Sequence, residues 1–217
     1  LLDRGIVEEF HRLRGLLDRG RDWLAQPGHT EKLEQTLRNL LTCQRPEMLG
    51  KLVGWNVACF WKQLFQRCYG KFPLLHAQGG AGSGKTTMVL SLLSLFYLER
   101  ESTNLTVASS PYSVGQHMTS SSSLPLVLDE YKPWMMSTDK VNSFRALFRD
   151  AYNGKSVSKG GGNRDSDDYR SLHFTQYAAP LAFNSEAVED ETAILERVVL
   201  LTVVKPPASI TLKWLSR

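Results

Sequence analysis

The sequence predicts an α/β protein with about five parallel strands flanked by helices, preceded by a small N-terminal helical bundle. Two observations carry this prediction. In the first third of the chain, apolar residues recur every three or four positions, which is the spacing of amphipathic helices. Beyond that point, short apolar runs alternate with helical stretches, which is typical of a parallel sheet with helical crossovers. We therefore expect a helical bundle over residues 1–70 and an α/β core over residues 71–217.

The N-terminal region divides into three predicted helices. Pro27-Gly28 ends the first, and a second runs from about Thr30 to Leu41. The third starts near Pro46, because proline suits the first helical turn, and continues through Leu64.

Five apolar runs predict the strands of the core. They lie at residues 73–77, 105–109, 125–129, 178–183 and 197–204. The longer apolar stretch at residues 87–98 has the length and texture of a helix that follows the first strand.

The composition bounds the class of protein. A net charge of +4 and an isoelectric point near 9.0 permit a nucleic-acid partner without requiring one. No apolar run approaches the roughly 20 residues that cross a bilayer, so we expect no membrane partner. Cys43, Cys59 and Cys68 lie in apolar helical surroundings, so we expect buried free thiols and a reducing, cytoplasmic setting. The chain begins at Leu1 rather than methionine, which suggests a piece of a longer polypeptide.

A glycine-rich stretch after the first strand fits the phosphate-binding pattern G-x-x-x-x-G-K-[ST] without a gap. Glycines let successive backbone N–H groups point at phosphate oxygens, and the following helix adds the positive end of its dipole. The stretch predicts ATP binding, with Lys85 on the β and γ phosphates and the Thr86 hydroxyl on Mg²⁺. The alternative is a flexible glycine turn. The expected contacts are Gly79, Gly80, Ala81, Gly82, Ser83, Gly84, Lys85, Thr86 and Thr87.

The third apolar run ends in two acids, Asp129 and Glu130. We expect Asp129 to hold Mg²⁺ through water at the carboxyl end of its strand, and Glu130 to polarise the attacking water. An acidic pair at this place favours ATP hydrolysis, because small-molecule kinases and GTPases usually lack the glutamate.

Two further polar residues lie at the ends of the last two strand-like segments, one after the fourth and one at the start of the fifth. Asn184 ends the fourth apolar run and suits orientation of the attacking water, although asparagine is also a common turn residue. Arg197 opens the fifth run and suits an arginine finger inserted into a neighbour's active site. The alternative for Arg197 is a salt bridge with Glu191 or Glu196.

With these motifs, the chain from about Lys71 to Val204 resembles the AAA+ ATPases of the superfamily three helicase type, found in phage, plasmid and viral replication proteins. The resemblance rests on GGAGSGKT, PLVLDE, PLAFNSE and AILERVV. It implies a ring-forming homo-oligomer, typically a hexamer, in the host cell of a mobile element or virus. Flanking domains such as a primase would be missing from this piece. Under the resemblance, the N-terminal bundle is an oligomerisation collar; the alternative is a cover for the sheet.

The same resemblance implies a β-hairpin that projects into a central pore and grips single-stranded DNA. The segment at residues 144–174 stands in its place, and Lys155, Lys159 and Arg164 are the candidate DNA contacts. By composition alone this segment is a solvated flexible loop.

The leading functional hypothesis is therefore an ATP-driven DNA helicase or translocase. The alternative is a switch ATPase, in which nucleotide sets the oligomeric state and no strand moves. A small-molecule kinase is disfavoured, because no arginine-bearing lid segment is evident.

Overall fold

A computed structural model of the chain describes residues 11, 14–15, 18–22, 25–42, 44–94, 104–160 and 172–205. Its centre is a five-stranded, all-parallel sheet with the strand order β2-β3-β6-β1-β7. The strands are β1 (Leu74–Gln78), β2 (Asn104–Thr106), β3 (Leu126–Asp129), β6 (Leu181–Ser185) and β7 (Val198–Thr202). The predicted α/β fold with five parallel strands is confirmed.

At strand β1 the strand order of the sheet changes direction: the strands on its two sides are reached by connections that run opposite ways. The chain leaves β1 for the far strand β2, returns through β3 to β6 beside β1, and then crosses to β7 on the other side of β1. In open parallel sheets, ligands bind at the carboxyl ends of the strands next to such a switch point. The residue that follows β1 at this edge is Gly79.

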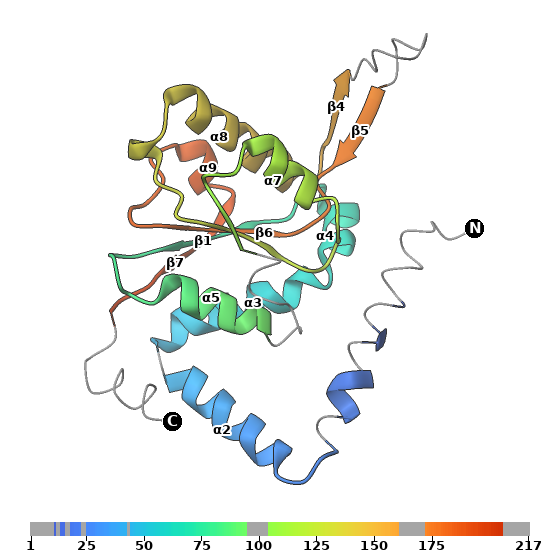
Figure 1. Ribbon diagram of the computed structural model, residues 1–217, viewed down its shortest axis with the longest axis vertical. Coiled ribbons are helices and arrows are strands. Elements are labelled where there is room, and N and C mark those ends of the chain that lie inside the picture. Colours follow the sequence, from blue (N-terminus) through green and yellow to red (C-terminus); the bar gives the residue numbers. More distant parts are fainter. Residues whose placement is uncertain are drawn as a thin grey trace.

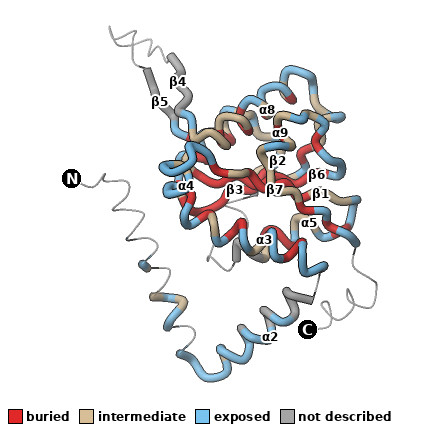
Figure 2. The backbone as a smooth tube through the Cα atoms, turned by 180° about the vertical axis from the view of Figure 1, so that it is seen from behind, coloured by how far each residue is buried: buried red, intermediate tan, exposed pale blue. Residues whose placement is uncertain are grey.

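Helices cover both faces of the sheet (Figure 1). On one face lie α3 (Pro46–Cys59) and α5 (Lys85–Ser94), whose buried side chains share a core with β1 and β7. On the other lie α7 (Pro111–His117), α8 (Thr138–Asn153) and α9 (Thr192–Leu195). Figure 2 shows that burial concentrates in the strands and in the sheet-facing sides of these helices.

The N-terminal helices differ in part from the prediction. The predicted third helix is two helices, because a turn at Phe60 and Trp61 separates α3 from α4 (Lys62–Tyr69). Helix α3 covers the sheet, with Leu52 and Trp55 in the same core as β1. The described side chains of α2 (His29–Thr42) are mostly exposed (Figure 2). A separate bundle with a boundary at residue 70 stays a prediction.

The thiols also differ from expectation. Cys59 is a buried free thiol, but Cys68 is exposed, because it lies on a side of α4 that the protein does not cover. Cys43 lies outside the described residues. Among the described helices, none is long and apolar enough to cross a membrane.

A two-stranded antiparallel ribbon interrupts the α/β core between α8 and β6. Strands β4 (Ser156–Gly160) and β5 (Leu172–Gln176) pair with Lys159 opposite His173. The ribbon projects away from the body of the molecule (Figure 1). The expected hairpin is therefore present at the expected place in the chain.

Candidate nucleotide-binding site

The glycine-rich loop joins the end of β1 to the start of α5, as the phosphate-binding pattern requires. Gly82 and Gly84 have φ angles of 70° and 87°, which side-chain-bearing residues rarely adopt. Gly79 is crowded instead, since an added Cβ would lie 2.3 Å from the carbonyl oxygen of Val203. The loop thus needs glycine for two different physical reasons.

Lys85 is the first residue of α5 and turns back into the loop. Its Nζ donates to the carbonyl oxygens of Gly79, at 2.6 Å, and Gly80, at 3.0 Å. The ammonium is therefore held within the loop by two weakly basic carbonyls, partners for which a phosphate oxygen would compete well. Thr87 lies exposed in the same first turn of the helix.

Three donors from different segments converge on one carboxylate oxygen of Asp129. Oδ1 accepts from Thr86 Oγ1 at 2.9 Å, from Asn184 Nδ2 at 3.1 Å and from the backbone N–H of Glu130 at 3.0 Å. Because β1, β3 and β6 are parallel, their carboxyl ends meet at one edge of the sheet. The structure thus brings Thr86, Asp129 and Asn184 together.

Glu130 is the one non-glycine residue with positive φ among the described residues, at 58°. A side-chain-bearing residue in this region costs on the order of 1 kcal/mol, and such residues cluster at functional sites. The conformation directs the chain to Tyr131, whose N–H donates to the carbonyl oxygen of Asn184 at 2.8 Å. The exposed carboxylate of Glu130 thus lies next in sequence to Asp129 at the open edge of the sheet.

Two buried polar atoms at this edge have no hydrogen-bond partner. They are Oδ1 of Asn184, whose residue is 1% exposed, and Oγ of Ser83, whose residue is 3% exposed. Buried polar groups are nearly always paired, because leaving one unpaired costs about 1–3 kcal/mol. Such atoms at a phosphate-type loop fit a site that is completed by a ligand.

The donor set also suits Mg²⁺. This ion is usually held by one or two carboxylates together with substrate phosphates and water. Thr86 and Asp129 supply a hydroxyl and a carboxylate, and the three donors at Oδ1 leave Oδ2 unused by those contacts. Over the described parts of the chain, no group of three or more His, Cys, Asp or Glu is arranged so that it could hold a metal ion, so an all-protein metal cage is not found there.

His76 fixes β1 to β6 just before the loop. Its Nε2 lies 2.6 Å from Ser185 Oγ, and its ring stacks on Phe183 with centroids 4.3 Å apart. Burial lowers the pKa of His76 to about 4, so the imidazole is neutral at neutral pH. The residue stiffens the platform of the site and adds no charge to it.

Lys132 and Glu186 also lie beside the site, and the motifs did not single them out. Lys132 Nζ pairs with Glu186 Oε1 at 2.9 Å. The hydrogen bond to Glu186 raises the pKa of Lys132, and the same bond, with a smaller contribution from Lys85, lowers the pKa of Glu186. Their signal in the sequence was position alone: Lys132 follows β3 by three residues, and Glu186 directly follows β6.

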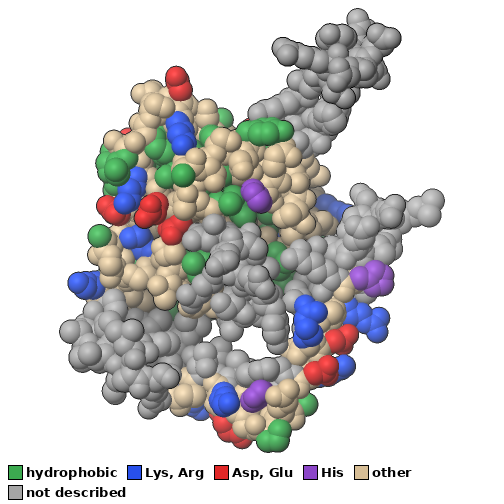
Figure 3. All heavy atoms as spheres, viewed as in Figure 1, with side chains coloured by type: hydrophobic (Ala, Val, Ile, Leu, Met, Phe, Trp, Pro, Cys, Tyr) green, Lys and Arg blue, Asp and Glu red, His purple; other side chains and the backbone are tan. Residues whose placement is uncertain are grey.

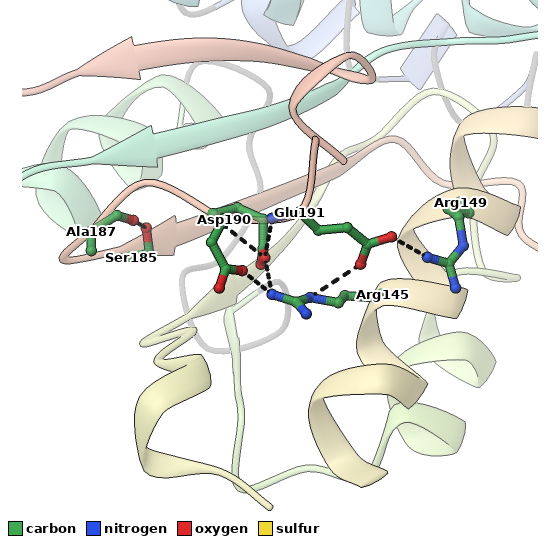
Figure 4. A network of polar contacts seen from close by, with 7 residues as sticks. Arg145, Arg149, Ser185, Ala187, Asp190 and Glu191 are labelled. Atoms are coloured by element: carbon green, nitrogen blue, oxygen red, sulfur yellow. Dashed lines mark hydrogen bonds and ion pairs between the residues drawn. The ribbon is translucent and has the colours of Figure 1, made fainter. Parts of the chain in front are cut away.

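The loop after β6 is held on α8 by an ion-pair network (Figure 4). Arg145 pairs with Glu189, Asp190 and Glu191, and Arg149 pairs with Glu191. The side chain of Glu189 is fully buried, and burial of Tyr131, with a smaller contribution from the charge of Glu189, raises the pKa of Tyr131. Acidic and basic side chains accordingly intermix on the α8 side of the face shown in Figure 3.

Arg197 lies at the amino ends of the strands, on the side of the sheet opposite to the glycine-rich loop. Its carbonyl oxygen accepts from the N–H of Leu74, the first residue of β1, at 3.0 Å. At about 3.3 Å per residue, the length of β1 separates that edge from Gly79 by more than about 13 Å. Its guanidinium donates to the carbonyl oxygen of Ala193 and lies 5.5 Å from the ring centroid of Tyr152. Glu191, one of its alternative partners, is engaged by Arg145 and Arg149.

The three candidate DNA contacts are described unequally. Lys155 is exposed immediately after the end of α8, and Lys159 has its backbone in β4. Arg164 lies outside the described residues.

Taken together, these features define an α/β protein with a five-stranded parallel sheet and a glycine-rich loop between β1 and α5. No protein-family model matches the sequence, and no curated protein matches it. Solved structures do match. The X-ray structure of JCV helicase aligns with a TM-score of 0.57 and 16% identity, over 96% of this chain and 57% of that one. Its inhibitor-bound form gives 0.56 and 17%, over 97% and 55%.

A second solved helicase shares the fold. The active helicase Cch of SCCmec type IV aligns with a TM-score of 0.53 and 13% identity, over 78% of this chain and 31% of that one. The chain therefore has a helicase-type fold, and it spans no more than 57% of the length of these three structures.

Proposed function

We propose that this chain is the ATP-hydrolysing motor domain of a ring-forming DNA helicase or translocase. The observation that carries the proposal is the convergence of Thr86 and Asn184 on Asp129, beside a glycine loop that already surrounds Lys85. Three motifs that are far apart in the sequence thereby meet at one edge of the sheet. The helicase-type fold supports the nucleic-acid part of the proposal.

Each residue of the site has a role in this proposal. The loop amides and Lys85 bind the phosphates, with Lys85 exchanging its two carbonyl partners for phosphate oxygens. Glu130 accepts a proton from the attacking water, and Asn184 orients that water with its unpaired amide oxygen. Thr86 and Asp129 would hold Mg²⁺, which supplies neutralisation of phosphate charge when it is bound.

The experiment separates binding from turnover in single variants. Lys85→Ala should abolish binding of ATP, because it removes the cation inside the loop. Glu130→Gln should bind ATP with an affinity within about threefold of wild type and lose hydrolysis by about 10²-fold or more. Binding is read by titration with a fluorescent ATP analogue, and turnover by phosphate release. Equal loss of binding in both variants would contradict the role of Glu130.

A further inference from the structure

Lys132 is anchored close to the proposed triphosphate site by its neighbour in the chain. Tyr131 is fully buried, its N–H donates to the Asn184 carbonyl, and its ring packs edge-on against Phe148 and Phe183, with centroids 5.2 and 5.6 Å away. This packing fixes the backbone of Lys132 three residues beyond Asp129, while the side chain stays 24% exposed. The ammonium is therefore tethered beside the site and still able to move.

Charged side chains of both signs interact with one another near the glycine loop. Glu186 follows Asn184 by two residues, pairs with Lys132 at 2.9 Å and also feels the charge of Lys85. The negative charges of Glu130 and Asp129 also contribute to the raised pKa of Lys132. Glu186 is thus an anion that pairs with Lys132 and is also influenced by the charge of Lys85, at the strand ends where the proposed function places the terminal phosphate.

We propose that Lys132 is a second phosphate-binding cation, and that Glu186 is the internal anion that occupies it until a triphosphate arrives. The inference rests on the proposed function and names the γ-phosphate as the part of the nucleotide that this pair recognises. A γ-phosphate carries the same sign of charge as Glu186, so it repels that carboxylate and attracts the ammonium. ADP lacks this group, so it leaves the ion pair in place.

The contrast with Glu189 shows why Glu186 is able to leave. Glu189 lies three residues further on, is fully buried at its side chain and is held by Arg145, so freeing it would leave a buried charge unpaired. The Glu186 side chain is 39% exposed, and its exposed pair with Lys132 is the kind that is worth little in isolation. The network fixes one end of the loop and leaves Glu186 as its mobile charge.

The test compares affinities for Mg²⁺ with a non-hydrolysable ATP analogue and for Mg²⁺ with ADP, measured by calorimetry. Lys132→Ala should lower the affinity for the ATP analogue by about tenfold, since one charge-assisted contact is lost. It should change the affinity for ADP by less than about twofold. Lys132→Arg should keep most of the preference for the ATP analogue. Glu186→Gln should raise the affinity for the ATP analogue by about threefold, because it removes the anion that competes for Lys132.

The control is Lys71→Ala, which removes one exposed charge at the other edge of the sheet and should change neither affinity. Melting curves establish that each variant is folded. If folded Lys132→Ala binds both nucleotides like wild type, or loses both equally, the inference is wrong while the proposed function stands. If the wild-type chain binds neither nucleotide, the proposed function itself fails.

Discussion

Asp129 is the residue at which the site is assembled. A carboxylate oxygen that accepts three hydrogen bonds is held in one orientation, and each of the three donors comes from a different segment of the chain. Displacement of the α5 helix, the β6 strand or the turn after β3 therefore reaches the same atom. This arrangement couples the glycine loop to the two strands that carry the proposed catalytic side chains.

Gly79 and Gly80 give a matched pair for testing the loop. Gly79→Ala places a Cβ 2.3 Å from the Val203 carbonyl oxygen, so we expect it to lower the free energy of unfolding by about 1–3 kcal/mol. Gly80→Ala meets no atom within 4 Å and needs no positive φ, so it should change stability by less than about 0.5 kcal/mol. Urea denaturation measures both. Equal destabilisation by the two substitutions would count against the observed packing of the loop.

Residue-level chemistry was predictable where a motif fixes both residue type and place. The sequence places Thr86, Asp129 and Asn184 at or beyond the carboxyl ends of three strands of one parallel sheet, and such strand ends meet. The positive φ of Glu130 and the Lys132–Glu186 pair depend on how the irregular loops after β3 and β6 pack against each other. No spacing rule describes that, so sequence reasoning missed them.

At the scale of elements, the sheet was predictable because fully buried parallel strands appear as short, continuous apolar runs. The break between α3 and α4 was not, because the helical spacing of apolar residues continues across Phe60 and Trp61. Tertiary structure decides it: after the turn, α4 directs Lys62 into the protein. Lys62 is 1% exposed and donates to the carbonyl oxygens of Tyr177, at 3.3 Å, and Ala179, at 2.8 Å.

The buried lysine predicts a pH dependence of stability. Burial lowers the pKa of Lys62 from its ordinary value of 10.5 to about 7, so between these values the unfolded chain binds a proton that the folded chain does not. Stability should therefore fall as the pH drops from about 10 to 7, by up to about 1.4 kcal/mol per pH unit from this group. Below pH 7 its contribution becomes constant.

Lys62→Met removes this titration and isolates it from other groups. We expect the difference in free energy of unfolding between wild type and Lys62→Met to change in favour of wild type as the pH rises from 7 to 10. Lys71→Met, at an exposed lysine, serves as the control and should follow the wild-type profile. A difference that is constant across this range would mean that Lys62 is charged in the folded protein.

At the scale of the whole molecule, the two edges of the sheet carry different parts of the proposed chemistry. Lys85, Asp129 and Asn184 lie at the carboxyl edge, whereas Arg197 lies at the amino edge beside Tyr152. One copy of the chain is thus poorly placed to bring Arg197 to its own phosphate loop. A ring, in which the amino edge of one subunit faces the loop of the next, would allow contact and is the reason for proposing a finger in trans.

Mixed rings test this division of labour. Arg197→Ala should keep ATP affinity within about threefold of wild type and lose about 10³-fold in hydrolysis, the scale of an arginine finger. Mixing it with Lys85→Ala subunits should restore part of the activity, since some interfaces then pair an intact loop with an intact arginine. Rates are measured across mixing ratios. A mixture no more active than its components would mean that Arg197 is not a finger in trans and has only a structural role, through its contacts with Ala193 and Tyr152.

The most direct measurement is the rate of ATP hydrolysis with and without single-stranded DNA. It is made on the wild-type chain and on a variant carrying Lys155→Glu, just before the ribbon, and Lys159→Glu, in strand β4. A motor predicts wild-type hydrolysis that rises several-fold with DNA, and a variant that keeps the basal rate and loses the stimulation. Hydrolysis that ignores DNA in both proteins would contradict the motor and favour a switch, and no hydrolysis in either would contradict the site itself.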